Sequence, residues 1–132
     1  MCQRVLLVDD EPLNREIGAF LLQDLGNLVV DLANDGDEAV NMAGSRPYDL
    51  ILMDLHMPTM DGIEATRKIR QIKGYEATPI LALTANSRDD VWESCRQAGM
   101  SGYLSKPVVP EQFFPILRQW LGRADGTGTV SR

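Results

Sequence analysis

Two hydrophobic patterns alternate along this sequence, and their alternation constrains the fold more than any other feature. Short apolar runs rich in Val, Leu and Ile occur at residues 5–8, 28–33, 50–53, 80–83 and 103–105. Between and after these runs, apolar residues recur at the three- and four-residue spacing of one helix face. Strands that are apolar on both faces and alternate with helices are typical of a parallel sheet covered by helices on both sides.

Right-handed crossovers restrict such a chain to a few doubly wound topologies. We therefore predict an α/β fold with a five-stranded parallel sheet in the flavodoxin-like order 2-1-3-4-5. One domain should span residues 4–121, and the small polar residues 122–132 read as a flexible tail or linker. Pro115 lies inside the last helical pattern, so we expect that helix to be kinked or to begin later than its apolar stripe.

Charge and composition argue against several kinds of partner. The chain has 19 acidic and 13 basic residues, for a net charge of -6, and the basic residues are scattered, so we expect no direct contact with nucleic acid. Cys2 and Cys95 lie too far apart in the sequence to suggest a disulfide framework or a zinc site. No apolar run approaches the length of about 18 residues that membrane insertion requires. These features favour a cytoplasmic domain.

Polar residues follow four of the predicted strands directly. Asp9 and Asp10 come after the first strand, Asp54 after the third, Thr84 after the fourth and Lys106 after the fifth. In open parallel sheets, ligands bind beyond the carboxyl ends of the strands, where the winding reverses. The predicted strand order places the first and third strands at that reversal, so these side chains should converge on one pocket.

Converged carboxylates need a cation, because each pair at 4 to 5 Å repels by about 3 to 4 kcal/mol at an effective dielectric near 20. Mg²⁺ is held by one or two carboxylates together with waters and phosphate oxygens. A Lys neutralises a phosphoryl oxygen as a point charge, a Thr hydroxyl hydrogen-bonds to another, and an aspartate can itself form an acyl phosphate. The pocket therefore suits phosphoryl chemistry with Mg²⁺.

The motifs that surround these residues are those of a known family. They read Val-Leu-Leu-Val-Asp-Asp-Glu-Pro from Val5, Leu-Met-Asp-Leu-His-Met-Pro-Thr-Met-Asp-Gly around Asp54, Ala-Leu-Thr-Ala around Thr84, and Gly-Tyr-Leu-Ser-Lys-Pro ending at Pro107. On these motifs the chain resembles the response regulator receiver domain over residues 4–121.

The resemblance implies a role for each matching residue. Asp54 would be the phosphoacceptor, with Thr84 and Lys106 binding the phosphoryl group. Mg²⁺ would be held by Asp10, by Asp54 and by the backbone carbonyl of His56, with Asp9 reaching the ion mainly through water. Tyr103 would act with Thr84 as a conformational switch, while His56 and Asn86 would border the path of the attacking water and tune self-dephosphorylation.

The Asn14-Arg15 pair and the Glu-Ala-Thr-Arg run from Glu64 resemble receivers attached to hybrid sensor histidine kinases. Such a domain takes a phosphoryl group from a histidine kinase or a histidine phosphotransfer domain, and its self-association would be weak. It is a phosphoacceptor with slow self-dephosphorylation rather than a turnover enzyme. The resemblance also admits the cytoplasmic part of a membrane-anchored sensor kinase.

Other interpretations of the same residues remain open. A Mg²⁺-dependent aspartyl-phosphate phosphohydrolase also uses a strand-end Asp, but it generally has a second acid two residues later, where this chain has His56. A flavin or nucleotide binder would need a Gly-rich or Ser/Thr-rich loop after the first strand. A pseudo-receiver would lack the chemical residues. Asp9 and Asp10 could also serve only to cap the first helix, and Trp92 could be core edge or a partner contact.

Overall fold

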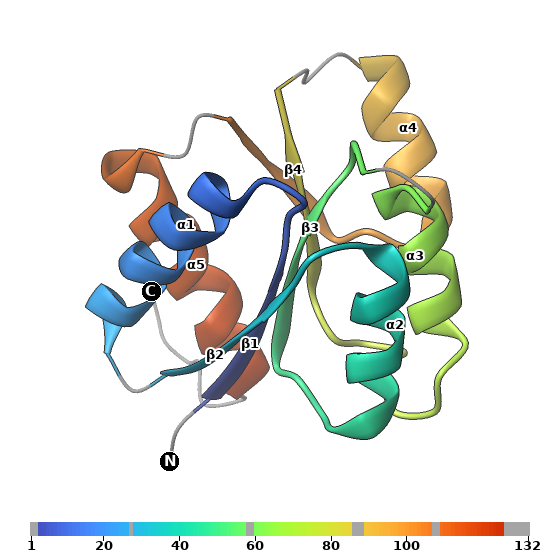
Figure 1. Ribbon diagram of the computed structural model, residues 1–132, viewed down its shortest axis with the longest axis horizontal. Coiled ribbons are helices and arrows are strands. Elements are labelled where there is room, and N and C mark those ends of the chain that lie inside the picture. Colours follow the sequence, from blue (N-terminus) through green and yellow to red (C-terminus); the bar gives the residue numbers. More distant parts are fainter. Residues whose placement is uncertain (1–2, 27, 58–59, 86–88, 107–108, 126–132) are drawn as a thin grey trace.

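The chain folds into a five-stranded parallel sheet between two layers of helices in a computed structural model (Figure 1). The structure describes residues 3–26, 28–57, 60–85, 89–106 and 109–125. The strands are β1 (Gln3–Val8), β2 (Leu28–Ala33), β3 (Leu50–Asp54), β4 (Ile80–Thr84) and β5 (Gly102–Ser105). The helices are α1 (Pro12–Leu25), α2 (Gly36–Ser45), α3 (Gly62–Arg70), α4 (Asp89–Ala98) and α5 (Pro110–Asp125).

The strand order is β2-β1-β3-β4-β5, and every neighbouring pair is parallel. The prediction from the apolar runs is confirmed in both order and direction. Every residue of β3 and β4 is buried, as expected for central strands that are covered on both faces. The carboxyl ends of the strands therefore open onto one edge of the molecule, at the top of Figure 1.

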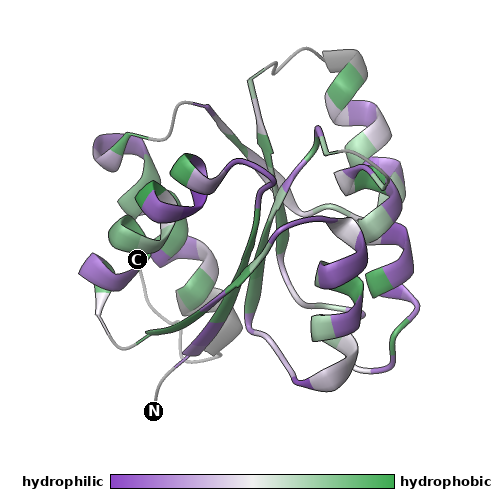
Figure 2. Cartoon of the chain, viewed as in Figure 1, coloured by the Kyte–Doolittle hydropathy of each residue, from purple (hydrophilic) through white to green (hydrophobic). Residues whose placement is uncertain are grey.

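Two separate cores lie on the two faces of the sheet. α1 and α5 cover one face, where Leu22, Phe113 and Leu117 pack on β1, β3 and β4 (Figure 1). α2, α3 and α4 cover the other, where Ile69 and Cys95 pack on the opposite side of the same strands. The central strands are predominantly hydrophobic, while the helices carry polar residues between apolar ones (Figure 2). Side chains on both faces of the sheet thus pack against helices, and this packing holds the strands and their carboxyl ends in place.

The last helix differs from its prediction. α5 begins at Pro110, ahead of the apolar stripe that starts at Phe113, so the alternative of a later start is wrong, and the kink stays a prediction. Proline is well suited to the first helical position, where its fixed φ matches the helix and its missing N–H costs nothing. Pro115 lies within the helix, with its side chain exposed. α5 also continues four residues past Leu121, to Asp125, into the tail predicted at 122–132, and residues 126–132 of that tail lie outside the described residues.

Two aspartates cap helices that lead away from the sheet. Asp35 accepts a hydrogen bond from the backbone N of Glu38 at the start of α2, at 2.8 Å, and Asp61 accepts one from Glu64 at the start of α3, at 2.9 Å. Asp61 is thus the cap of α3, and Gly62 is its first helical residue. These caps satisfy backbone donors that have no partner within the helix.

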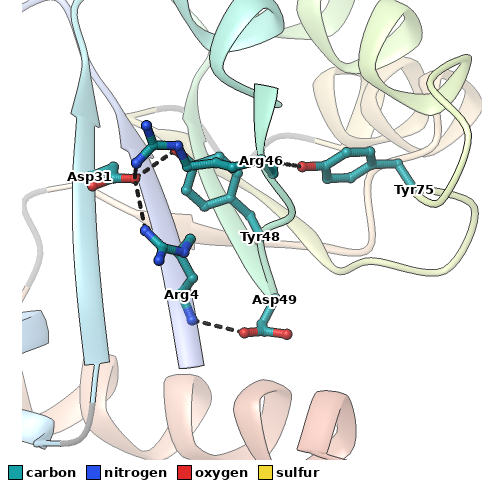
Figure 3. Close-up of polar contacts among 6 residues, drawn as sticks. All are labelled: Arg4, Asp31, Arg46, Tyr48, Asp49 and Tyr75. Carbon is teal, nitrogen blue, oxygen red and sulfur yellow. Dashed lines mark hydrogen bonds and ion pairs between the residues drawn. The ribbon is translucent and has the colours of Figure 1, made fainter. Parts of the chain in front are cut away.

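A polar cluster at the opposite edge of the sheet ties the edge strand β2 to its neighbours (Figure 3). Asp31 of β2 accepts from the Tyr48 hydroxyl at 2.7 Å and pairs with Arg46 at 3.3 Å and Arg4 at 3.5 Å. The Tyr75 hydroxyl donates to the carbonyl of Arg46 at 2.9 Å, joining the segment before β3 to the turn after α3. Burial raises the pKa of Tyr48, and the bond to Asp31 raises it further, so the phenol stays protonated as the donor.

Arg70, the last residue of α3, gathers backbone carbonyls from separate segments. Its guanidinium donates to the carbonyls of Tyr75 at 2.5 Å, Thr78 at 2.7 Å and Gly99 at 2.7 Å. Gly99 follows the last residue of α4 and has a φ of 107°, a conformation that favours glycine. The carboxyl ends of α3 and α4 are therefore fixed to each other through one side chain.

Candidate functional site

Three carboxylates meet at the carboxyl edge of the sheet. Asp9 and Asp10 follow β1, Asp54 ends β3, and one oxygen atom of each lies within 4.8 Å of the others. Asp9 and Asp54 are almost completely buried, with exposed fractions of 1% and 2%. The predicted convergence of the acidic side chains is confirmed, because β1 and β3 are adjacent strands.

Lys106 completes this group from the end of β5. Its Nζ donates to Asp54 Oδ1 at 3.0 Å and pairs with Asp9 Oδ2 at 3.3 Å. The backbone N of Lys106 donates to the carbonyl of Thr84 at 2.8 Å, which aligns the end of β5 with the end of β4. Thr84 is itself buried, one position beyond Leu83, the partner of Asp54 in the sheet. The side chains named by sequence at the ends of β1, β3 and β5 therefore lie in contact.

Burial dominates the electrostatics of the pocket. It raises the pKa of the Asp54 carboxyl above its usual range, and the charge of Asp9 adds to the rise, although the bond to Lys106 opposes it. Burial alone would lower the pKa of Lys106, but its bonds to Asp54 and Asp9 outweigh that effect and raise it. The lysine thus stays charged, and its single positive charge faces two buried carboxylates.

Every polar group of Asp9 has a protein partner. Its backbone N donates to the carbonyl of Ala33 at 3.2 Å, and its Oδ1 accepts from the N of Glu11 at 3.0 Å. Its Oδ2 faces Lys106, and its carbonyl accepts from Arg15 Nη1 at 2.7 Å. Glu11, at the start of α1, makes no side-chain cap of its own. Asp9 therefore does contribute to the start of the helix, but the contact with Lys106 exceeds what a cap requires.

Two of the remaining predicted residues, His56 and Tyr103, belong to the described part of the chain. The side chain of His56 is exposed, and its backbone N donates to Asp54 Oδ1 at 3.2 Å. His56 and Asp10 line an open cleft of about 630 Å³, with Met57, Asp61 and Val91. Tyr103 is 42% exposed, and its ring centre lies 5.6 Å from that of Trp92, which packs at the edge of the core. Asn86 lies outside the described residues.

The donor set of the pocket fits a small hard cation. Carboxylate oxygens are the ligands that Mg²⁺ prefers, and it commonly uses one or two of them while keeping several waters. Asp9 has both oxygens bonded to protein groups, which suits contact through water rather than direct ligation. Asp10 opens onto the cleft beside His56, where water and a phosphoryl group have room.

The contact with Arg15 was not predicted. The sequence indicated this residue only through its resemblance to hybrid-kinase receivers. The position of Arg15 in the sequence could have indicated this contact. Side chains of a helix point toward its amino end, so an Arg near the start of a helix can reach back to the strand end that precedes it.

Gly62 sets how closely α3 approaches the end of β3. A Cβ there would meet the carbonyl group of Asp54 and lie 3.0 Å from the Cα of Leu55. We expect Gly62→Ala to lower the free energy of unfolding by about 1 to 3 kcal/mol, because backbone must move. Gly44→Ala, where a Cβ meets nothing within 4 Å, should instead be stabilising by up to about 1 kcal/mol. Urea unfolding measures both, and equal effects would contradict the close approach.

Comparison with known proteins agrees with this geometry. The family model for the response regulator receiver domain matches residues 5–118. The signal transduction histidine-protein kinase BarA of Escherichia coli is 39% identical over 132 residues, which cover all of this chain and 14% of that protein. The sensor protein GacS of Pseudomonas syringae is 40% identical over 124 residues, covering 92% of this chain and 14% of that protein. The chain thus spans only a small part of these relatives.

Solved structures share the fold closely. The receiver domain of a sensor histidine kinase from Pseudomonas aeruginosa is 43% identical, with a TM-score of 0.84 over 92% of this chain and 99% of that one, and it has a magnesium ion coordinated in its active site cleft. The chemotaxis protein CheY4 of Vibrio cholerae is 34% identical, with a TM-score of 0.86 over 90% of this chain and 98% of that one. By motifs, strand order and family match together, this chain belongs to the response regulator receiver domain family.

Proposed function

We propose that the chain accepts a phosphoryl group from a phosphohistidine onto Asp54, in the presence of Mg²⁺, as one step of a phosphorelay. The observation that carries the proposal is the placement of Asp54, which is buried among Asp9, Asp10 and Lys106 at the end of a central strand. A carboxylate held there is aligned to attack, because its Oδ1 is already bonded to Lys106 and to the backbone N of His56.

Each neighbour has a defined part in the proposal. Lys106 would neutralise a phosphoryl oxygen, and Thr84 would donate a hydrogen bond to another. Asp10, Asp54 and the carbonyl of His56 would hold Mg²⁺, and Asp9 would reach it through water. When bound, the ion offsets the negative charge of the carboxylates and of the incoming phosphoryl group. The magnesium seen in the Pseudomonas aeruginosa receiver supports this assignment.

The phosphohydrolase alternative is disfavoured by the same observations. The residue two positions after Asp54 is His56, whose exposed side chain lies at the rim. Family membership supports a phosphoacceptor, with any hydrolysis being slow loss of its own phosphoryl group. His56 and Asn86 would tune that loss, and the decay of label in His56→Ala compared with the parent measures the share of His56.

The test is to label the protein with a small phosphodonor and Mg²⁺ and to map the modified residue by mass spectrometry. We expect label on Asp54 and none in Asp54→Asn. Asp61→Asn is the matched control, because Asp61 is exposed at the end of the same cleft and Asn keeps its capping role. Label on another residue, or undiminished label in Asp54→Asn, would exclude the proposed function.

The surface of α1 beside the pocket suits the partner that donates the phosphoryl group. Leu13, Ile17 and Phe20 are 63%, 44% and 73% exposed, and their spacing places them along one side of the helix. α1 begins two residues after Asp10, so a domain that brings a phosphohistidine to Asp54 has to cover this end of the helix. We infer that a histidine kinase or histidine phosphotransfer domain binds here.

A substitution of Phe20 can distinguish an effect on partner binding from an effect on the chemistry at Asp54. With Phe20→Ala we expect transfer from a phosphohistidine domain to slow about tenfold, as for loss of an aromatic contact worth about 1.4 kcal/mol. Labelling by a small phosphodonor should stay unchanged, because Phe20 lies outside the pocket. Val29→Ala, at a 37% exposed residue of β2, serves as the control. Equal transfer rates in Phe20→Ala and the parent would place the docking surface elsewhere.

The phosphoryl group would be read out through α4, β5 and α5. Thr84 lies between the pocket and this face, and Tyr103 stands on the neighbouring strand with its ring against Trp92. A hydroxyl drawn toward a phosphoryl oxygen leaves space that an aromatic ring can fill, which couples local charge to packing. To move the equilibrium from 1:99 to 99:1, phosphorylation must favour the active state by about 5.5 kcal/mol.

Trp92 reports on this coupling directly. We expect beryllofluoride, used as the phosphoryl mimic with Mg²⁺, to change tryptophan fluorescence in Trp120→Phe, where only Trp92 remains, because its contact with Tyr103 is rearranged. The change should be absent from Trp92→Phe. If neither the fluorescence of Trp92 nor the amide shifts of β5 respond while the mimic occupies Asp54, this readout is wrong.

A further inference from the structure

Arg15 reaches from α1 back to the acid pair. Its Nη1 donates to the backbone carbonyl of Asp9 at 2.7 Å, while its own backbone N forms the first bond of the helix, to Glu11, at 3.1 Å. The carbonyl of Asp9 belongs to the peptide plane that joins Asp9 to Asp10. Because a peptide unit is rigid, the guanidinium fixes the orientation of the backbone from which the Asp10 carboxylate projects.

The bond from Arg15 holds the backbone just beyond the end of β1, where the hydrogen bonds of the sheet end. Just after β1, the backbone N of Asp9 still donates to the carbonyl of Ala33, the last residue of β2, at 3.2 Å. The Asp9 carbonyl then accepts from a side-chain cation, which is a stronger donor than a backbone amide. The guanidinium thereby places a positive charge beside Asp9 and Asp10. Among the hydrogen bonds of the described residues, it donates to no carboxylate oxygen of either residue.

Among the residues that the structure describes, no other hydrogen bond or ion pair supports the orientation of Asp10 in a comparable way. Lys106 and the N of Glu11 hold the Asp9 side chain, and His56 and Lys106 hold Asp54. Asp10 lies on the cleft side, beside His56, and is less buried than Asp9. The direction of its backbone is therefore what aims it at the other two carboxylates.

We propose that Arg15 is a positioning residue for the metal site, which holds the peptide between Asp9 and Asp10 so that Asp10 is aimed at the cation. This inference rests on the proposed function, because it assumes that Mg²⁺ binds at Asp10. Arg15 itself touches neither the cation nor the phosphoryl group. A purely structural tie between α1 and β1 would leave the affinity for Mg²⁺ unchanged.

The test compares Arg15→Gln and Arg15→Lys with the parent chain. Binding of Mg²⁺ alone is followed by the amide shifts of Asp10 and by calorimetry. We expect the dissociation constant to rise about tenfold in Arg15→Gln, as is typical when a residue that orients a metal ligand is lost, and less in Arg15→Lys, which keeps a charged donor. Arg67→Gln, on the exposed surface of α3, should bind Mg²⁺ as the parent does.

A second readout separates positioning from general damage. When a small phosphodonor labels the protein, the half-saturating Mg²⁺ concentration should rise in Arg15→Gln, while the rate at saturating Mg²⁺ stays within about twofold of the parent if Arg15 acts only through the metal ligand. If the parent chain binds Mg²⁺ and the dissociation constant is the same in Arg15→Gln, the role of Arg15 is wrong but the proposed metal site is not affected. A parent chain whose Asp10 amide does not respond to Mg²⁺ would overturn the proposed metal site as well.

Discussion

Replacing Lys106 with Met is expected to lower the free energy of unfolding by about 3 kcal/mol when no metal is present, because it leaves two buried carboxylates without their cation. Met keeps most of the length of the side chain, so the loss reports on charge rather than on packing. The value lies at the low end for broken buried pairs, since 23% of the Lys106 side chain is exposed. Urea unfolding in the presence of a chelator measures it.

The matched control is Lys73→Met, at an exposed residue of the turn after α3. Its effect should stay within about 0.5 kcal/mol, as for most surface substitutions. Saturating Mg²⁺ should recover part of the loss in Lys106→Met, because the ion then supplies the positive charge that the lysine no longer gives to Asp9 and Asp54. A loss in Lys106→Met no larger than in Lys73→Met would mean that the two carboxylates are protonated or hydrated and do not depend on the lysine.

Mg²⁺ at a free concentration 100 times its dissociation constant is expected to stabilise the parent chain by about 2.7 kcal/mol. The stabilisation arises because the ion binds the folded arrangement of Asp10 and Asp54 and not the unfolded chain. In Asp10→Asn the gain from Mg²⁺ at the same concentration should be much smaller. Without metal this variant should be more stable than the parent, because two carboxylates within 4.8 Å of each other repel by about 3.5 kcal/mol or more at an effective dielectric near 20.

Asp37→Asn provides the control, since Asp37 is an exposed acid in the first turn of α2, away from the pocket. It should keep the full response to Mg²⁺. Urea unfolding of each variant with Mg²⁺ and with chelator gives the comparison. A gain in Asp10→Asn equal to that of the parent would place the cation at another site.

The strands and their ends could be predicted because burial leaves a direct trace in the sequence. A central parallel strand is apolar on both faces, so β3 and β4 read as uninterrupted apolar runs, and the first polar residue marks the carboxyl end of each strand. Asp54 and Thr84 were found in this way. The predicted order of the strands was then enough to place Asp9, Asp10 and Lys106 near Asp54 and Thr84.

Contacts made by partly exposed side chains left no such trace. The bonds of Arg15, Asp31 and Arg70 join segments that are distant in the sequence or turn back along it, and no periodic pattern encodes them. The start of α5 was misjudged for a related reason. The apolar stripe of a helix indicates only the face toward the core, and the first turn of α5 begins with exposed residues that contribute nothing to that stripe.

The attachment of Arg70 to Gly99 determines how α4 can move. The carboxyl end of the helix is held through this guanidinium to the turn after α3, while the amino end follows β4 at the edge of the sheet that carries Asp54. A helix of 10 residues is about 15 Å long, so tilting it by about 10° around its fixed end shifts the free end by about 2.6 Å. Such a tilt would move the amino end of α4 most, and this end lies at the same edge of the sheet as Asp54.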